Sequence, residues 1–305
     1  MHPSSASDSL HETATGRFQD LEAPPPDTSF SLGESPGWGV EARAALARRA
    51  VFVLTPLVAA LVAIGIWQFV VAATGVSADI LPSPGRVLNM AWRYRDDLWL
   101  NTVPTLEETL LGLAVTISAA ALFATVTDFS VWARRIIYPL LVASQTIPIM
   151  IIAPLMVIWF GFGLFPKLLV IVLVSFFPIT VALMDGFNST EPEAANLLRS
   201  MGANRVQEFL KVRVPTALPY FFTGLRISVA WSVVAAIFSE YVGAEQGLGI
   251  YMQIQKNDFR TDLVLAAVLV TSLASVALFA LTYIVQIVTI PWYSKSKRGQ
   301  GASRP

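Results

Sequence analysis

Residue types that do catalytic chemistry are scarce in this sequence. Its 305 residues include no cysteine and only two histidines, His2 and His11. Without cysteine the chain has no disulfide or thiolate metal site, and its body lacks the histidine that a Ser-His-Asp triad or a zinc site needs. The Gly-x-x-x-x-Gly-Lys-Ser/Thr loop that holds nucleotide phosphates is also missing. We therefore expect no catalytic residues, no metal site and no cofactor in this chain.

Apolar residues dominate the composition. The chain is 54% hydrophobic and 14% charged, whereas about 25% of the residues of an ordinary soluble domain are charged. Its formal net charge is zero, from 21 basic and 21 acidic residues, so no global field attracts acidic partners. These values exclude a disordered or nucleic-acid-binding chain and argue against a soluble enzyme.

Six long apolar stretches, each uncharged at its centre, account for this composition. We place them at 51–73, 105–127, 136–160, 167–186, 223–243 and 263–290. A helix that crosses a bilayer needs about 20 mostly apolar residues. The short alternating segments of a β-barrel are not seen. The sequence therefore predicts an all-α membrane protein with six transmembrane helices.

The domain limits follow from these spans. Residues 1–42 are rich in Ser, Pro, Thr and Asp, so we expect a disordered cytoplasmic tail. Residues 43–294 form the predicted transmembrane domain, with a long polar loop at about 187–222, and residues 295–305 form a second cytoplasmic tail. The polar stretch 74–104 is expected to be a turn and a short helix on the surface.

Basic residues are distributed unequally between the two sides of the predicted bundle. One side holds both termini and the long polar loop, and it carries fifteen of the 21 Lys and Arg residues. The other six are Arg86, Arg93, Arg95, Lys167, Lys256 and Arg260. Because cytoplasmic loops carry an excess of Lys and Arg, we expect both termini and the long loop to be cytoplasmic.

The polar loop at 187–222 has the pattern of two short helices. Pro192 suits the first turn of a helix, and Gly202 suits the left-handed residue that ends one. Asn204 can cap a second helix, which we expect to end before Pro215. The first helix would carry an apolar face at helical spacing: Leu197, Leu198 and Met201. Such a hairpin could receive a soluble partner, and the alternative is a helix lying on lipid headgroups.

This loop resembles that of the integral-membrane permeases of bacterial ABC importers. The family's loop reads Glu-Ala-Ala, three residues, Gly, nine residues and Ile-x-Leu-Pro. Counted from Gly202, nine residues precede Val212-Arg213-Val214-Pro215, whereas Glu193-Ala194-Ala195 lies three residues too early. Shorter motifs in the family's order extend the resemblance over about residues 50–292: Leu81–Pro84, Ile147–Pro148, Ala153–Leu155, Trp159–Gly163, Gly224–Arg226, Glu240 and Gly247–Gly249.

The resemblance implies the type I ABC importer permease fold with a cytoplasmic coupling helix. ATP, Mg²⁺ and hydrolysis would belong to a dimer of separate ATPase subunits, and a periplasmic or lipid-anchored solute-binding protein would deliver the solute. We expect a permease homodimer in the bacterial inner membrane and no nucleic-acid partner. The residues expected to contact the ATPase are Glu193, Ala194, Ala195, Leu197, Leu198, Met201, Gly202, Ala203 and Pro215.

Five other residues are candidates for the translocation pathway: Pro148, Pro154, Trp159, Glu240 and Tyr241. The two prolines permit kinks in the third span, because a proline leaves a backbone carbonyl free. Trp159 would stack on an aromatic solute or anchor the chain at the membrane surface. Glu240 lies near the outer end of the fifth span, where an acid faces either a polar interior or water.

The span centres carry no Lys or Arg, which suits a neutral or weakly cationic heteroaromatic solute better than an anion. Around Glu108 and residues 197–202 the chain resembles permeases for pyrimidine precursors of thiamine. We therefore predict hydroxymethylpyrimidine or a related thiamine precursor, with sulfonate, taurine or nitrate as the alternative. A secondary transporter is a more distant alternative, because we find no internal repeat. A membrane enzyme or a structural anchor would not explain the Gly202-to-Pro215 spacing.

Overall fold

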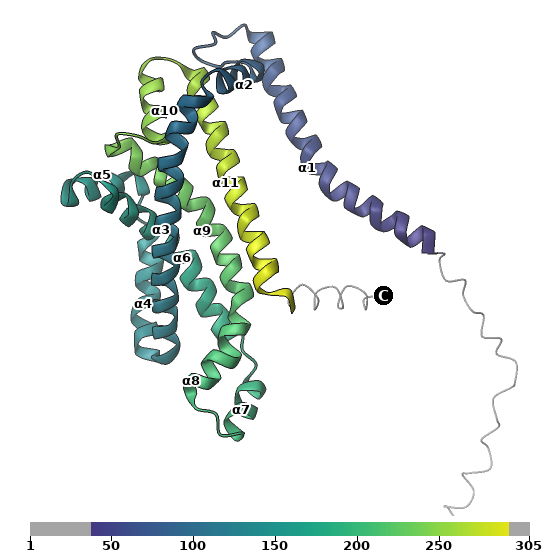
Figure 1. The fold of residues 1–305 in the computed structure, drawn as a ribbon, viewed down its shortest axis with the longest axis vertical. Helices are drawn as coiled ribbons and strands as arrows, with labels where there is room; N and C mark the ends of the chain where they lie inside the picture. Colours follow the sequence, from purple (N-terminus) through teal and green to yellow (C-terminus); the bar gives the residue numbers. More distant parts are fainter. Residues whose placement is uncertain (1–37, 293–305) are drawn as a thin grey trace, which may run out of the picture. The chain divides into compact units, whose positions relative to one another are not determined.

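The computed structural model describes residues 38–292, with side chains from residue 54 onward. The predicted tails lie outside the described residues, except for 38–42, which are helical. Of the described residues, those up to Ala63 belong to one compact unit and those from Ile64 onward belong to another. Helix α1 (Trp38–Thr74) runs from the first unit into the second. Within the described residues every regular element is a helix (Figure 1).

The membrane-spanning length of the helices confirms the all-α membrane fold. Five segments of the described chain are long and apolar enough to cross a bilayer: Leu54–Thr74, Arg95–Phe129, Leu164–Asn188, Arg205–Gly243 and Thr261–Thr289. They correspond to α1, α3 (Arg95–Phe129), α6 (Leu164–Asn188), α9 (Val214–Gly243) with its preceding turns, and α11 (Thr261–Thr289). A bent pair of helices brings the total to six if the pair counts as one span.

That bent pair corrects the predicted third span, 136–160, which is not one helix. Helix α4 (Val131–Ser144) and helix α5 (Ile149–Phe160) meet at 103°. The break falls at Pro148, which precedes α5 and holds an extended backbone. A proline lacks the N–H that would continue the helix and disfavours helical geometry in the residue before it. Pro154, by contrast, is accommodated within α5.

The polar loop is helical for longer than predicted. Helix α7 (Pro192–Ser200) and helix α8 (Arg205–Glu208) form the two expected arms, but the helical backbone that begins with α8 does not stop before Pro215. A π-helical segment, Phe209–Arg213, carries the chain without interruption into α9. The Val214 amide bonds to the Phe209 carbonyl five residues back. In an α-helix the Pro215 ring would clash with the carbonyl four residues earlier. The wider π-helical turn displaces that carbonyl, so the helix can continue.

The bundle is built around α6, which packs along both α3 and α9. Between α6 and α9 the buried Ser228 hydroxyl donates to the Ser175 carbonyl at 2.6 Å. The expected surface helix is α2 (Pro84–Arg93), and α10 (Leu248–Asn257) packs against α9 and α11. In Figure 1, α7 and α8 lie at one end of the bundle and α2 and α10 at the other. We call these the hairpin end and the opposite end.

Candidate functional site

The hairpin formed by α7, α8 and the π-helical segment has two distinct faces. Leu197 and Met201 point outward, with exposed fractions of 65% and 80%. Ala195 is buried, and Ala194, Leu198 and Ala203 are half-buried. Glu193 and Gly202 are exposed, and Pro215 is half-buried where the hairpin joins α9. The predicted apolar face is therefore divided, because Leu198 is half-buried against the protein whereas Leu197 and Met201 remain exposed.

The turn between the two arms has the geometry that the sequence predicts. Gly202 has a φ of 84°, a left-handed conformation that glycine adopts without steric cost. The Ala203 amide bonds to the Leu198 carbonyl at 3.0 Å and so closes the end of α7. Asn204 then caps α8: its side chain accepts from the Gln207 amide at 2.8 Å, and the Gln207 side chain accepts from the Asn204 amide at 2.9 Å. Both arms are thus fixed by local hydrogen bonds.

A line of four charged residues joins the hairpin to α3. The Arg199 guanidinium donates to both Glu208 carboxylate oxygens, at 2.8 and 3.1 Å. Arg213 donates to the same carboxylate at 3.3 Å and to the Asp128 carboxylate at 2.6 Å. Hydrogen bonding to Glu208 raises the pKa of Arg199 above its ordinary value. No sequence pattern reveals this network, because Asp128 lies 85 residues from Arg213.

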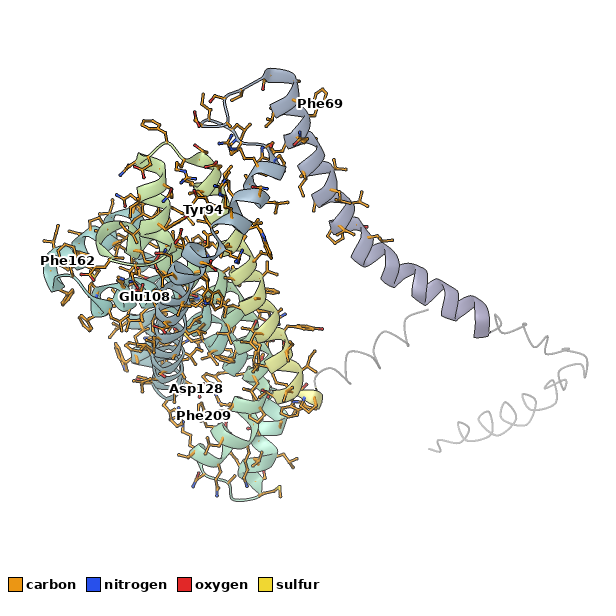
Figure 2. The ribbon with its side chains drawn as sticks, turned by 45° about the horizontal axis from the view of Figure 1, so that its top comes forward. Phe69, Tyr94, Glu108, Asp128, Phe162 and Phe209 are labelled. Atoms are coloured by element: carbon orange, nitrogen blue, oxygen red, sulfur yellow. The ribbon has the colours of Figure 1, made fainter. Side chains whose placement is uncertain are left out.

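Aromatic packing reinforces the same junction. The Phe209 ring lies between the rings of Phe129 and Phe187, at centroid distances of 5.1 and 5.2 Å. The Arg205 guanidinium donates to the Phe129 carbonyl at 3.2 Å and lies 5.1 Å from the centre of the Phe129 ring. Figure 2 shows Asp128 and Phe209 close together near the hairpin end. The hairpin is therefore attached to the end of α3 by both ionic and apolar contacts.

Glu240 lies in a closed junction at the opposite end and is fully buried. Its carboxylate accepts hydrogen bonds from the Thr105 hydroxyl and the Gly249 amide, both at 2.6 Å. Thr105 accepts in turn from the Leu248 amide at 2.9 Å. Side chains of α3 and α9 thus satisfy the free amides at the start of α10, which a helix end in a low-dielectric environment requires. In this conformation no solute reaches the carboxylate.

The other pathway candidates do not converge on Glu240. Pro148 is exposed at the break between α4 and α5, Pro154 is half-buried within α5, and Trp159 is exposed at the end of α5. Tyr241 is half-buried, and its ring lies 6.4 Å from that of Phe238. The structure therefore does not assemble these residues into one site, and their part in translocation stays a prediction.

A second buried acid, Glu108 of α3, pairs with Lys167 of α6 at 2.5 Å. Both side chains are about nine-tenths buried, and the second Glu108 carboxylate oxygen has no hydrogen-bond partner. The apolar pattern predicts Lys167 at the edge of a span, because the fourth span is expected to begin at residue 167. The structure instead starts α6 three residues earlier, at Leu164. The charge of Lys167 is thereby neutralised inside the bundle.

Among the described residues, two sizeable clefts open at the hairpin end. The larger, of 920 Å³, lies between α6, α9 and the chain beyond α11; its charged lining residues are Asp185 and Glu191, and Tyr220 and Trp292 add aromatic rings. The smaller, of 390 Å³, lies between α4 and α6, and its charged lining residues are Arg134, Arg135 and Asp185. The larger cleft thus offers two acids, whereas the smaller offers two arginines beside one acid.

The bundle of apolar helices, its broken helix pair and its attached hairpin can be compared with known proteins. A model of the family described as "Binding-protein-dependent transport system inner membrane component" matches residues 112–293. The chain belongs to this family. It is a multi-pass membrane permease of the ABC importer class, and its relatives are permease components and not enzymes.

Named relatives match almost the whole permease domain. The chain is 35% identical to the formylaminopyrimidine transport permease protein ThiX of Halalkalibacterium halodurans, over 81% of this chain and 99% of the relative. It is 32% identical to the riboflavin transport system permease protein RibX of Chloroflexus aurantiacus, over 74% of this chain and 85% of RibX. It is 29% identical to the taurine transport system permease protein TauC of Escherichia coli, over 75% of this chain and 86% of TauC.

A solved structure supports the same fold. The permease resembles a chain of an amino acid ABC transporter crystallised with histidines, with a TM-score of 0.53 over 67% of this chain and 97% of that chain. Sequence identity between the two is 14%, so this likeness concerns the fold alone.

The Glu240 junction generates a stability prediction. A Cβ atom at Gly249 would overlap the Ile237 carbonyl and the Glu240 side chain. We expect Gly249→Ala to cost about 1–3 kcal/mol, as overpacking usually does, and to lower the unfolding temperature by about 2–4 °C per kcal/mol. Gly85→Ala is the matched control, because a Cβ there meets nothing within 4 Å. Tryptophan fluorescence of the detergent-solubilised permease measures the unfolding temperature of each variant. Equal unfolding temperatures for the two variants would contradict the close packing around Gly249.

Proposed function

We propose that this permease imports a small heteroaromatic solute of the thiamine-precursor class, powered by a separate ATPase dimer. The similarity to ThiX carries the proposal, because it reaches 35% identity and covers 99% of that relative. A formylaminopyrimidine is a neutral or weakly basic ring, as is the hydroxymethylpyrimidine expected from the sequence. In the proposed assembly two copies of the permease line the pathway and a solute-binding protein delivers the solute.

The hairpin is the proposed docking surface for the ATPase. Its outward apolar side chains come from both arms: Leu197, Met201, Val206 and Leu210. Glu193 adds an exposed acid beside them. Apolar side chains that remain exposed beside a polar rim are typical of a protein interface. ATP and Mg²⁺ would bind to the ATPase, so the permease contributes the moving surface and no cofactor chemistry.

The larger cleft supports a solute without negative charge. The charged lining residues of this cleft are the acids Asp185 and Glu191, and its aromatic residues suit a flat ring. Lys167, the basic residue buried in α6, is already neutralised by Glu108. An anionic solute would meet carboxylates there, whereas an aminopyrimidine would find hydrogen-bond acceptors.

Sulfonate or taurine import is the second candidate function. The smaller cleft favours it, because two arginines, Arg134 and Arg135, outnumber the one acid Asp185 in its lining, and the taurine permease TauC is among the relatives. This cleft lies on the α4 side of α6, away from the surface of α9.

The uptake of labelled solutes tests the substrate class. In vesicles that contain the permease with its ATPase and binding protein, we expect ATP-dependent uptake of formylaminopyrimidine or hydroxymethylpyrimidine. Excess taurine and nitrate should leave this uptake unchanged, whereas excess of the other pyrimidine should compete. Uptake of taurine alone would contradict the proposed substrate class while leaving the permease function intact.

Gly202 gives a test of coupling. Valine at this left-handed position costs about 1–2 kcal/mol, and each 1.4 kcal/mol is a tenfold change in population. We expect Gly202→Val to lower ATP-driven uptake by about tenfold while the amount of permease in the membrane stays the same. Gly75→Val is the control, because Gly75 has a comparable φ of 62° at the opposite end. Equal uptake by the two variants would contradict a coupling role for the hairpin.

The proposed orientation can be tested because the chain has no cysteine. A single introduced cysteine is then the only thiol, and both Met201 and Phe259 are about four-fifths exposed, at 80% and 77%. In spheroplasts that express the permease without its partners, we expect a membrane-impermeant maleimide to label Phe259→Cys at once. Met201→Cys should react only after the membrane is permeabilised. The reverse pattern would mean that the hairpin faces outward.

A further inference from the structure

Helix α7 has few apolar contacts of its own with the bundle. It is nine residues long, and Ala195 is its one fully buried side chain. Its main attachment is an ion pair, in which both oxygens of the Glu208 carboxylate accept hydrogen bonds from the Arg199 guanidinium. Paired hydrogen bonds of this kind fix direction as well as distance. Glu208 itself is 1% exposed, so this carboxylate is held away from solvent although it lies at a hairpin.

From Glu208 the charged line continues to α3. Arg213 donates from its Nε and Nη2 atoms to Glu208 and from its Nη1 atom to Asp128. Asp128 is the penultimate residue of α3. The formal charges of the four groups cancel, and each acid faces a guanidinium. Removing Asp128 would leave the Arg213 guanidinium paired with Glu208 alone, so the line would be cut between the hairpin and α3.

Helix α3 is a suitable receiver of force from the hairpin. Its 35 residues span about 52 Å at 1.5 Å per residue. At its far end Thr105 and Asn101 bond to the start of α10, with the Asn101 side chain accepting from the Gly247 amide at 3.1 Å. Displacement of Asp128 would therefore reach the opposite end of the bundle through one continuous helix.

The hairpin has a second connection to the bundle, through the π-helical segment into α9. π-Helical turns are rare, usually occur as single turns within α-helices, frequently at functional sites, and are positions where helices kink. If the hairpin moved on this turn without the charged line, α3 would follow through the Phe129 and Phe209 ring contact and through the Arg205 hydrogen bond to the Phe129 carbonyl. The charged line adds carboxylate–guanidinium contacts, which fix direction as well as distance.

We propose that Glu208 and Asp128 are positioning residues that transmit movement of the docked hairpin, through Arg213, to α3. This inference rests on the proposed ATP-driven function and deepens it. The hairpin's outward face would bind the ATPase, and its inward charged line would carry the motion into the helix that reaches the opposite end of the bundle. Loss of this charged line would leave ATPase docking intact, but ATP would be hydrolysed without solute uptake.

The test measures uptake and ATP hydrolysis together in vesicles that contain the complete transporter. For Asp128→Asn we expect solute uptake per ATP hydrolysed to fall at least fivefold, while the hydrolysis rate and the yield of assembled complex remain those of the wild type. Asp96→Asn is the matched control, because Asp96 is a water-exposed acid at the other end of α3. Glu208→Gln should behave like Asp128→Asn.

Arg213 provides the rescue experiment. Lysine can still reach one carboxylate as a point charge, so Arg213→Lys should keep most of the wild-type uptake per ATP, whereas Arg213→Gln should lose it. The double variant Asp128→Asn with Arg213→Gln should be no worse than either single variant, because interacting residues are not additive.

Two results would overturn the inference. An unchanged ratio of uptake to hydrolysis in Asp128→Asn would show that α3 needs no charged link. A parallel loss of hydrolysis and of complex assembly in both Asp128→Asn and Glu208→Gln would show that these residues only maintain the docking surface. A wild-type transporter that takes up no solute on ATP would instead contradict the proposed function itself, and the inference with it.

Discussion

The structure depends on one constraint: a polar group inside an apolar bundle must find its partner within the protein. Water is not available there to replace a missing hydrogen bond, and each unsatisfied group costs several kcal/mol. Threonines of α3 meet the constraint locally, since Thr109 and Thr116 donate to carbonyls one turn back at 2.7 Å. Groups that have no local solution join helices together. The buried acids are therefore also the main polar ties between elements.

Three such ties involve α3, and they divide its length. Near its start, Thr105 and the Glu240 carboxylate of α9 hold the first amides of α10. One turn further, Glu108 binds Lys167 of α6. At its end, Asp128 binds Arg213 beside the hairpin. Between Glu108 and Asp128 the helix packs by small and apolar side chains such as Ala120 and Ala124, which are fully buried. Polar contacts thus fix α3 at its ends and leave its middle to van der Waals packing.

The sequence predicted the features that depend on neighbouring residues. Apolar stretches near 20 residues gave the spans, and the types of Pro192, Gly202 and Asn204 gave the hairpin, because helix starts and ends are decided by local hydrogen bonds. Features that depend on distant residues escaped it. The partners of Glu240 and Lys167 come from other helices, and the 103° bend is a property of a pair of helices. The sequence did not predict that the helix continues past Pro215. In an α-helix the proline ring clashes with the carbonyl four residues earlier, whereas the turn before Pro215 is π-helical and places that carbonyl differently.

The two faces of the hairpin follow from different physical demands. The proposed docking of the hairpin on an ATPase would benefit from apolar contact, which is non-directional and tolerates small changes of angle. Leu197 and Met201 on the outward face meet that demand. Contact with the bundle must instead keep one geometry while the hairpin moves. Charge-assisted pairs such as Arg199 with Glu208 define an angle as well as a distance. Under the proposed coupling, a hairpin with the two chemistries exchanged would hold the ATPase rigidly and slide against α3, so motion would be lost at the point where it enters the membrane domain.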